Sequence, residues 1–125
     1  MNSELLIYEN KDGNIKIDVR LEEETVWLTQ KTIAALFGVQ VPGISKHLDN
    51  IYESGELAKE ATISILETVQ TEGNRDVKRN IEHYNLDAII SVGYRVNSRQ
   101  ATQFRIWATQ RLKELEEDIK KMIKG

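Results

Sequence analysis

The stretch WLTQKTIAALFGVQVPGISKHLDNI, residues 27–51, contains two short amphipathic segments separated by a glycine. Their apolar residues recur at the steps of an α-helix: Ile33, Leu36 and Phe37 in the first segment, and Ile44, Leu48 and Ile51 in the second. Thr29 is a suitable N-cap for the first helix and Gly38 a suitable end, while Pro42 suits the first turn of the second helix. The stretch therefore predicts two helices joined by a tight turn.

This pair of helices has the features of a helix-turn-helix. Such a motif requires a small residue where the helices touch, a turn that allows positive φ, and an apolar inner face on the second helix. Ala34, Gly38 and Ile44 meet these requirements at gaps of four and six residues. The sequence therefore predicts a helix-turn-helix, which places its second helix in a DNA groove. A compact helical hairpin without DNA contact is the alternative.

The outward side of the second predicted helix carries small and polar residues: Gln40, Gly43, Ser45, Lys46, Asp49 and Asn50. Gln40 fits adenine, Lys46 fits guanine or phosphate, and Ser45 fits bases or backbone. Gly43 allows the helix N-terminus to approach a phosphate closely, where free N–H groups and the helix dipole favour anions. The negative charge of Asp49 opposes DNA contact, unless its side chain faces away from the DNA or accepts a hydrogen bond from cytosine. We expect all of these except Asp49 to contact DNA.

Strand-like segments flank the two helices. Residues 5–8, 15–21 and 25–28 read as three N-terminal strands, with an Asp-Gly turn after the first. Residues 62–84 read as a later hairpin that turns at Glu72-Gly73-Asn74. In winged helices, such a ribbon lays basic side chains along the DNA backbone beside the reading helix. Arg75, Lys78 and Arg79 suit that role, and a solvent-facing hairpin tip is the alternative.

Two more helices are expected after the hairpin. Asn85 can cap the first, Gly93 interrupts it, and Ser98 can cap a long last helix. The fold class that we predict is α+β: a winged helix-turn-helix-like domain with N-terminal β-strands, a β-hairpin wing and a long C-terminal helix. We expect this domain to span residues 1–113, with residues 114–125 as a charged helical extension.

The charge is unevenly distributed along the chain. The net charge of the 125 residues is −3, but residues 75–113 carry 8 basic and 3 acidic side chains, a net of +5. Residues 1–74 carry 6 and 13, a net of −7, and residues 114–125 carry 3 and 4, a net of −1. Because phosphate contacts depend on local charge, a basic face matters more for DNA binding than the total. A solvated surface with uneven charge is the alternative.

Composition restricts the other classes of function. The chain has no cysteine, which excludes disulfides and thiolate metal sites and favours a cytoplasmic location. No apolar run is long enough to span a membrane. The two histidines, His47 and His83, lack clustered carboxylates, so we expect no metal and no cofactor. We expect His47 to be packed and hydrogen-bonded. Without a nucleophile, metal spacing or phosphate loop, an enzyme is the least supported class.

The segment HYNLDAIISVGYRVNSRQATQFRIWATQRLKE, residues 83–114, strongly resembles the RhuM family of bacterial virulence-associated proteins. VWLTQKTIAALFG (26–38) and TEGNRDVKRNIEHYNLD (71–87) resemble the same family, so the resemblance covers nearly the whole chain. The order of strands, WLT helix start, helix-ending glycine and late F-R-x-W is more loosely similar to the Bro-N domain of phage antirepressors. These resemblances imply a DNA-binding, regulatory role in mobile or phage-derived loci. Since RhuM proteins usually continue further, we expect either a fragment or a short family member.

The 83–114 segment carries four arginines that suit phosphate contacts: Arg95, Arg99, Arg105 and Arg111. We include Arg95 and Arg99 among the candidate DNA-binding residues. For Arg105 and Arg111, ion pairs within the fold to Asp87 or Glu82 are an equal alternative.

Two functions follow as hypotheses. The first is a sequence-specific module that binds double-stranded DNA and regulates transcription. The second is a protein-protein interaction or oligomerisation module without direct DNA contact. Its basis is an apolar stripe on the last helix that suits a helix–helix seam and a homodimer: Leu112, Leu115, Ile119 and Met122. The alternative is that the stripe packs on its own domain up to Leu115.

Overall fold

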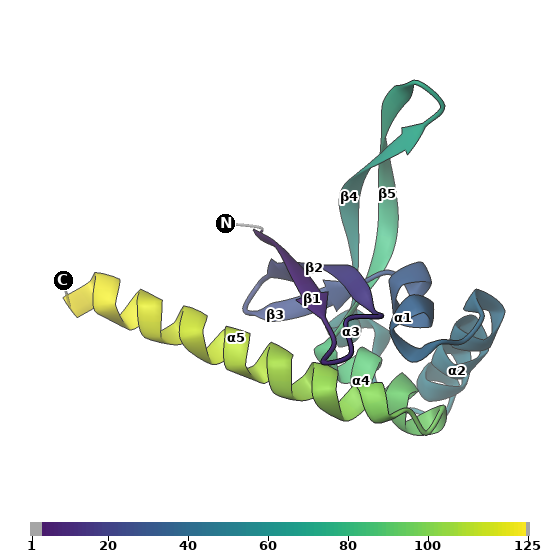
Figure 1. Ribbon diagram of the computed structural model, residues 1–125. Coiled ribbons are helices and arrows are strands. Elements are labelled where there is room, and N and C mark those ends of the chain that lie inside the picture. The colour runs from purple at the N-terminus through teal and green to yellow at the C-terminus, as the bar shows by residue number, and fades with distance from the viewer. Residues whose placement is uncertain (1–3, 125) are drawn as a thin grey trace.

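Five antiparallel strands form one sheet in the order β1-β2-β3-β5-β4, and helices cover one of its faces (Figure 1). The computed structural model describes residues 4–124, so residues 1–3 and 125 of the expected domain limits lie outside it. The elements are β1 (Glu4–Glu9), β2 (Lys16–Glu22), β3 (Thr25–Leu28), α1 (Gln30–Phe37), α2 (Val41–Glu53), α3 (Lys59–Thr62), β4 (Ile63–Glu72), β5 (Arg75–Asn85), α4 (Leu86–Arg95) and α5 (Arg99–Lys124). The α+β class is confirmed.

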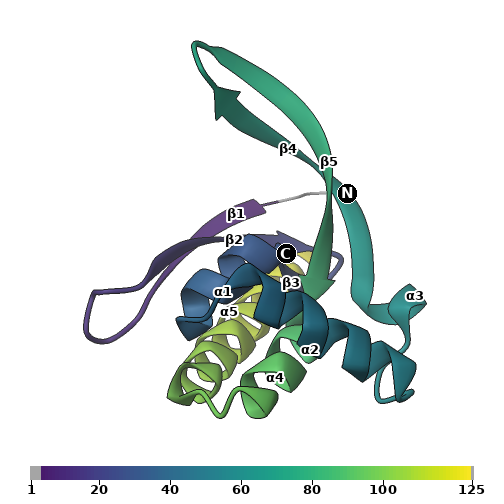
Figure 2. The same ribbon diagram turned by 90° about the vertical axis from the view of Figure 1, so that its right-hand side faces the viewer.

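The hairpin of β4 and β5 belongs to the sheet only at its base. β5 pairs with β3 at Trp27↔Asn85 and Leu28↔Tyr84, whereas it pairs with β4 from Ile63↔Tyr84 to Glu72↔Arg75. Residues 65–82, which we call the ribbon, therefore project from the body as a two-stranded arm (Figures 1 and 2).

The core lies between the sheet and the helices. Alternate residues of β1 and β2 point to this side, as the period of two requires: Leu6, Tyr8, Ile17, Val19 and Leu21 are buried. The first half of α5 packs beneath them, with the rings of Tyr8 and Phe104 edge to face at 5.2 Å between centroids. Phe104 is fully buried. The opposite, open face of the sheet carries Leu5 and Ile7, both exposed.

The two helices of the opening stretch form as predicted. Thr29 Oγ1 accepts a hydrogen bond from the Thr32 N–H at 3.1 Å, which caps α1. Gly38 ends α1 with φ of 68°, a left-handed conformation in which a side chain would be strained. Gln40 precedes α2, with Pro42 in its first turn. Thr29 and Gly38 thus set the ends of α1, whereas Gln40 makes no side-chain hydrogen bond at the start of α2.

One predicted helix end is wrong. Gly93 does not interrupt α4, which Asn85 caps as expected and which continues to Arg95. Instead Gly93 lies where α4 crosses α5 and α1: a Cβ on it would stand 2.4 Å from the Ala101 Cβ and 3.0 Å from the Phe37 ring. The glycine is a close-packing residue, and a sequence pattern that treats glycine as a break cannot distinguish the two roles.

The last helix is continuous from Arg99 to Lys124, so the expected boundary after residue 113 falls inside it. Ser98 Oγ accepts from the Gln100 N–H at 3.1 Å, as predicted for a cap. The outer half of α5 extends away from the body (Figure 1). Among the described residues, no helix has the length and apolar character needed to cross a membrane.

Candidate nucleic-acid interface

The candidate DNA-binding residues come from three parts of the molecule: α2, the ribbon and the α4–α5 turn. In Figure 1 the ribbon rises to the top, α2 lies at the right-hand side, and the α4–α5 turn lies at the lower right. Residues 40–50 and 95–99 therefore lie on neighbouring elements, whereas residues 75–79, near the tip of the ribbon, lie apart from them. We describe these three parts in turn.

The second helix presents its polar flank to solvent. Its inner face is buried, with Ile44 at 0% and Leu48 at 2% exposure. Gln40, Lys46 and Asn50 are exposed, while Gly43 and Ser45 are half-buried. Among ion pairs of the described residues, none involves Lys46. The α2 flank, which we define as these five polar or small residues, is therefore available for contact.

His47 lies beside the buried face of α2 and is half-buried, in agreement with a packed histidine. No hydrogen bond of its ring occurs among residues 4–124, so the expected hydrogen bond is not found. No group of three or more possible ligand residues that could hold a metal ion occurs in that range either.

The basic residues of the ribbon do not form a single edge. Neighbouring strand residues point to opposite faces, so Lys78 lies on one face and Arg75 and Arg79 lie on the other. The Arg79 guanidinium donates two hydrogen bonds of 2.8 Å to the Glu72 carboxylate, and this contact lowers the pKa of Glu72. Lys78 Nζ lies 3.9 Å from Glu67.

The expectation of a cationic wing therefore needs correction. Residues 63–85 contain three basic and four acidic side chains, a net charge of −1. Glu67 and Glu72 belong to β4, and the strand register brings them to the basic residues of β5. The sequence analysis considered only the basic residues of β5 and therefore missed the acidic residues of β4 that pair with them. Arg75 takes part in none of the ion pairs found in the described part of the chain.

The α4–α5 turn supplies the third part of the candidate interface. Arg95 Nη2 donates to Glu56 Oε1 at 3.2 Å, which ties the end of α4 to the segment after α2. Arg99 is exposed at the start of α5. Arg111 pairs with Glu114 on its own helix at 2.9 Å, so the alternative bridges to Asp87 or Glu82 are not formed by Arg111.

The base of the ribbon is joined firmly to α1. Tyr84 accepts a hydrogen bond from Gln30 Nε2 at 2.9 Å and donates one to Glu82 at 3.0 Å. Burial raises the pKa of Tyr84 to about 12, so its hydroxyl stays protonated and able to donate. These contacts hold the ribbon and the two-helix unit at a set angle. Sequence reasoning missed the Gln30–Tyr84 contact because the two residues are 54 positions apart.

His83 is also buried at the ribbon base, with 5% exposure. Its Nδ1 donates to the Ile81 carbonyl at 2.8 Å. Burial lowers the pKa of the imidazole, which is opposed in part by this hydrogen bond. A neutral histidine with this contact is a structural residue of the ribbon base, and it adds no positive charge to the candidate interface.

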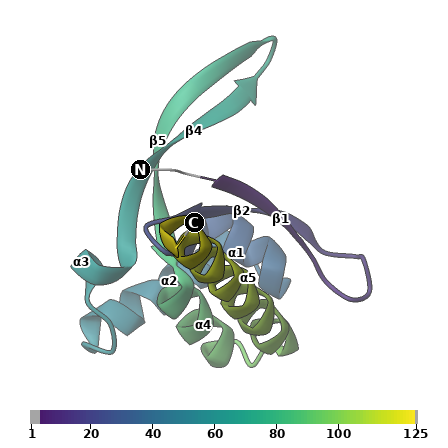
Figure 3. The same ribbon diagram turned by 90° about the vertical axis from the view of Figure 1, so that its left-hand side faces the viewer.

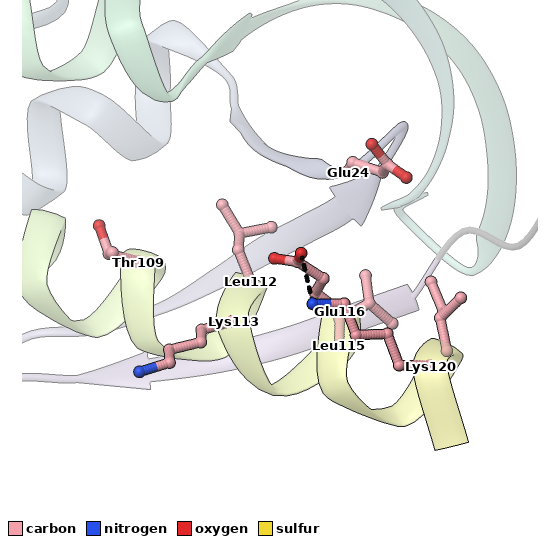
Figure 4. Close-up of a pocket in the computed structure, with 8 residues that line it drawn as sticks. Glu24, Thr109, Leu112, Lys113, Leu115, Glu116 and Lys120 are labelled. Atoms are coloured by element: carbon pink, nitrogen blue, oxygen red, sulfur yellow. Dashed lines mark ion pairs between the residues drawn. The ribbon is translucent and has the colours of Figure 1, made fainter. Parts of the chain in front are cut away.

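A separate groove lies along α5, away from the candidate interface. It has a volume of about 800 Å³ and lies between Glu24, in the β2–β3 turn, and the outer half of α5. Leu112, Leu115 and Ile119 line it, and a Glu116–Lys120 ion pair of 3.4 Å crosses its rim (Figure 4). Leu112 and Leu115 of the predicted stripe are half-buried and pack against the core, in agreement with packing on their own domain, whereas Ile119 and Met122 are exposed.

One of the comparisons with known proteins gives a match, which covers part of the chain. We found no significant match to a curated protein or to a solved structure. The similarity to the Bro-N domain stays a prediction. Over residues 61–121, which run from α3 through the ribbon and α4 into α5, the chain matches the family described as "Virulence protein RhuM family", and the resemblance read from the sequence is confirmed for this part.

Proposed function

We propose that this protein is a winged helix-turn-helix-like module that binds double-stranded DNA in a sequence-specific manner and regulates transcription from a phage-derived or mobile locus. The order of elements supports this proposal: β3, α1, α2, β4 and β5 follow one another, and their strands pair in the order β3-β5-β4. A winged helix has the same order of strand, two helices and hairpin. The free ribbon then takes the place of the wing.

The observation that carries the proposal is the α2 flank, whose polar residues Gln40, Lys46 and Asn50 are exposed to solvent. A reading helix must offer polar side chains that its own fold does not cover, and its N-terminal residues make the contacts with base edges. Gln40 precedes the first turn of α2, Ser45 and Lys46 lie in its N-terminal half, and all three are polar. Asp49 and Glu53 are acidic and lie in the other half. We therefore expect the N-terminal half to enter the groove.

Replacement of Lys46 tests this arrangement. We expect Lys46→Ala to weaken binding to the target duplex roughly tenfold if Lys46 reads a guanine, with relaxed preference at one position of the site. If Lys46 contacts phosphate instead, binding weakens for all sequences and the salt slope falls by about 1. The measurement is fluorescence anisotropy with duplexes from the neighbouring genomic DNA, at two salt concentrations.

Lys121→Ala is the matched control for this test, because Lys121 is an exposed lysine near the far end of α5. It should leave both affinity and salt slope unchanged. Equal binding by wild type, Lys46→Ala and Lys121→Ala would remove α2 as the reading helix. A wild type that binds no duplex at low salt would remove the function itself.

A second candidate function is self-association through α5, which its open apolar groove favours. The apolar stripe of α5 is covered by its own domain at Phe104 and Ala108, half-buried against the core at Leu112 and Leu115, and exposed from Ile119 onward. A second copy would therefore cover chiefly the last turns of the helix. The acidic run of residues 114–118 opposes close pairing of two copies at the same level, so we expect a weak dimer.

Ile119→Glu with Met122→Glu tests self-association without disturbing the core, since these side chains are 40% and 81% exposed. We expect sedimentation velocity to show a concentration-dependent dimer for wild type and a monomer for the double variant. Lys121→Glu, with a charge change but no loss of apolar area, should keep most of the dimer. A wild type that stays monomeric at about 100 µM, a concentration at which even a weak dimer of Kd in the µM range is populated, would exclude this candidate.

A further inference from the structure

A groove of about 470 Å³ opens between the ribbon base and the open face of the sheet. Its walls come from β2, the first turn of α1 and the two strands of the ribbon. Figures 2 and 3 show the ribbon leaning over the side of the molecule where β1 and β2 lie. We call this the sheet groove. None of its charged residues was singled out by the sequence patterns.

The sheet groove is cationic in a chain whose net charge is negative. Its lining contains three basic side chains, Lys16, Arg20 and Lys31, and one acidic side chain, Asp18. Lys16 and Lys31 are exposed, and neither takes part in an ion pair within residues 4–124. The two lysines therefore keep their charge available for an anion.

Arg20 has a different role in the same groove. Its Nη2 donates a 3.0 Å hydrogen bond to the Glu67 carbonyl and so links β2 to the ribbon across the groove. This contact holds the two walls together. We regard Arg20 as a positioning residue, since its guanidinium already has a partner within the fold.

An unused hydroxyl lies in the same groove. Thr68 Oγ1 is buried and has no hydrogen-bond partner in the protein, although Thr68 lines the sheet groove. A buried polar group without a partner costs free energy. A ligand oxygen that accepts from this hydroxyl would remove that cost.

We propose that the sheet groove binds a phosphate of the DNA backbone, with Lys16 and Lys31 as the charged contacts and the Thr68 hydroxyl as a donor. This inference rests on the proposed DNA-binding function and extends its interface. Thr68 pairs with Arg79 in the strand register, so both lie on one face of the ribbon, together with Arg75. A backbone that follows this face toward the ribbon base reaches the two lysines. Because Glu72 neutralises Arg79, these lysines supply charge that the ribbon itself lacks.

The test compares the double variant Lys16→Gln/Lys31→Gln with the matched pair Lys113→Gln/Lys121→Gln on α5, which packs on the other face of the sheet. Each measurement uses the whole chain and a duplex that the wild type binds. Loss of two phosphate contacts should weaken binding roughly tenfold or more near 0.1 M salt and reduce the salt slope by about 2. The α5 pair should match wild type. Thr68→Val should weaken binding with the salt slope unchanged, because it removes a donor and no charge.

The outcomes separate this proposal from the function on which it rests. If the groove variant matches wild type in affinity and slope while Lys46→Ala binds more weakly, the groove proposal is overturned and DNA binding by α2 stands. If wild type binds no duplex at low salt, both are overturned. Thermal unfolding of each variant shows whether a lost affinity comes from a lost fold: a groove variant that melts like wild type and still binds weakly supports the proposal.

Discussion

Replacement of Phe104 by alanine is expected to lower the free energy of unfolding by about 3–5 kcal/mol, the range found when a buried aromatic side chain is removed from a core. Phe104 is 0% exposed and joins α5 to the sheet through the Tyr8 ring at 5.2 Å, and its ring also lies 5.7 Å from that of Trp107 on the same helix. Loss of the ring leaves a cavity and also removes both aromatic contacts. Urea unfolding followed by circular dichroism measures the change.

Ile106→Ala is the matched control for Phe104→Ala, because Ile106 is on the same helix and 58% exposed. We expect a change of about 0.5 kcal/mol or less for this exposed position. Equal, small effects of the two substitutions would mean that α5 does not pack on the sheet through Phe104. A large effect of Phe104→Ala together with a small effect of Ile106→Ala supports the packing of α5 on the sheet, on which the candidate interface depends.

Substitution of Gly93 should give the second large loss of stability. Alanine in place of glycine normally stabilises a helix interior by up to about 1 kcal/mol. At Gly93 the added methyl would stand 2.4 Å from the Ala101 Cβ and 3.0 Å from Phe37, so the packed helices would have to shift to admit it. We therefore expect Gly93→Ala to destabilise the protein by about 1–3 kcal/mol despite its better helix propensity.

Gly43→Ala provides the opposite expectation within the same protein. Gly43 is inside α2, and nothing lies within 4 Å of the position of its Cβ. Thermal unfolding should therefore show an unchanged or higher stability for Gly43→Ala. A second variant, Gly93→Ala with Ala101→Gly, removes the methyl that the first substitution meets, and part of the stability should return. A stabilised Gly93→Ala protein would contradict the packing of α4 on α5.

The helix ends show which structural features could be predicted from the sequence and which could not. The ends of α1 and the start of α4 were predictable, because Thr29, Gly38 and Asn85 act on backbone groups three or four residues away. The role of Gly93 was not, because its neighbours Phe37 and Ala101 come from two other helices. α3 was also missed, since four residues carry too little periodicity to detect.

The candidate interface also combines features that could be predicted from the sequence with features that could not. The exposed flank and buried face of α2 follow from the spacing of its apolar residues, and so they were predictable. The charge of the ribbon was not, because the contact of Arg79 with Glu72 depends on the strand register. The sheet groove could not be predicted from the sequence for the same reason. Lys16 and Lys31 lie on different elements, and they line one groove only because the ribbon crosses over β2.

By itself, the sequence determined the α+β class, the order of the strands and of the longer helices, the ends of α1, the start of α4 and the buried faces of α1 and α2. These properties depend on backbone capping and on the periods of 3.6 and two residues, which act over short stretches of chain. The tertiary structure decided which charges remain unpaired, where two helices come close enough to require a glycine, and which lysines share a groove. Those properties depend on contacts between residues distant in the chain, and such contacts exist only after the sheet has paired and the helices have packed on it.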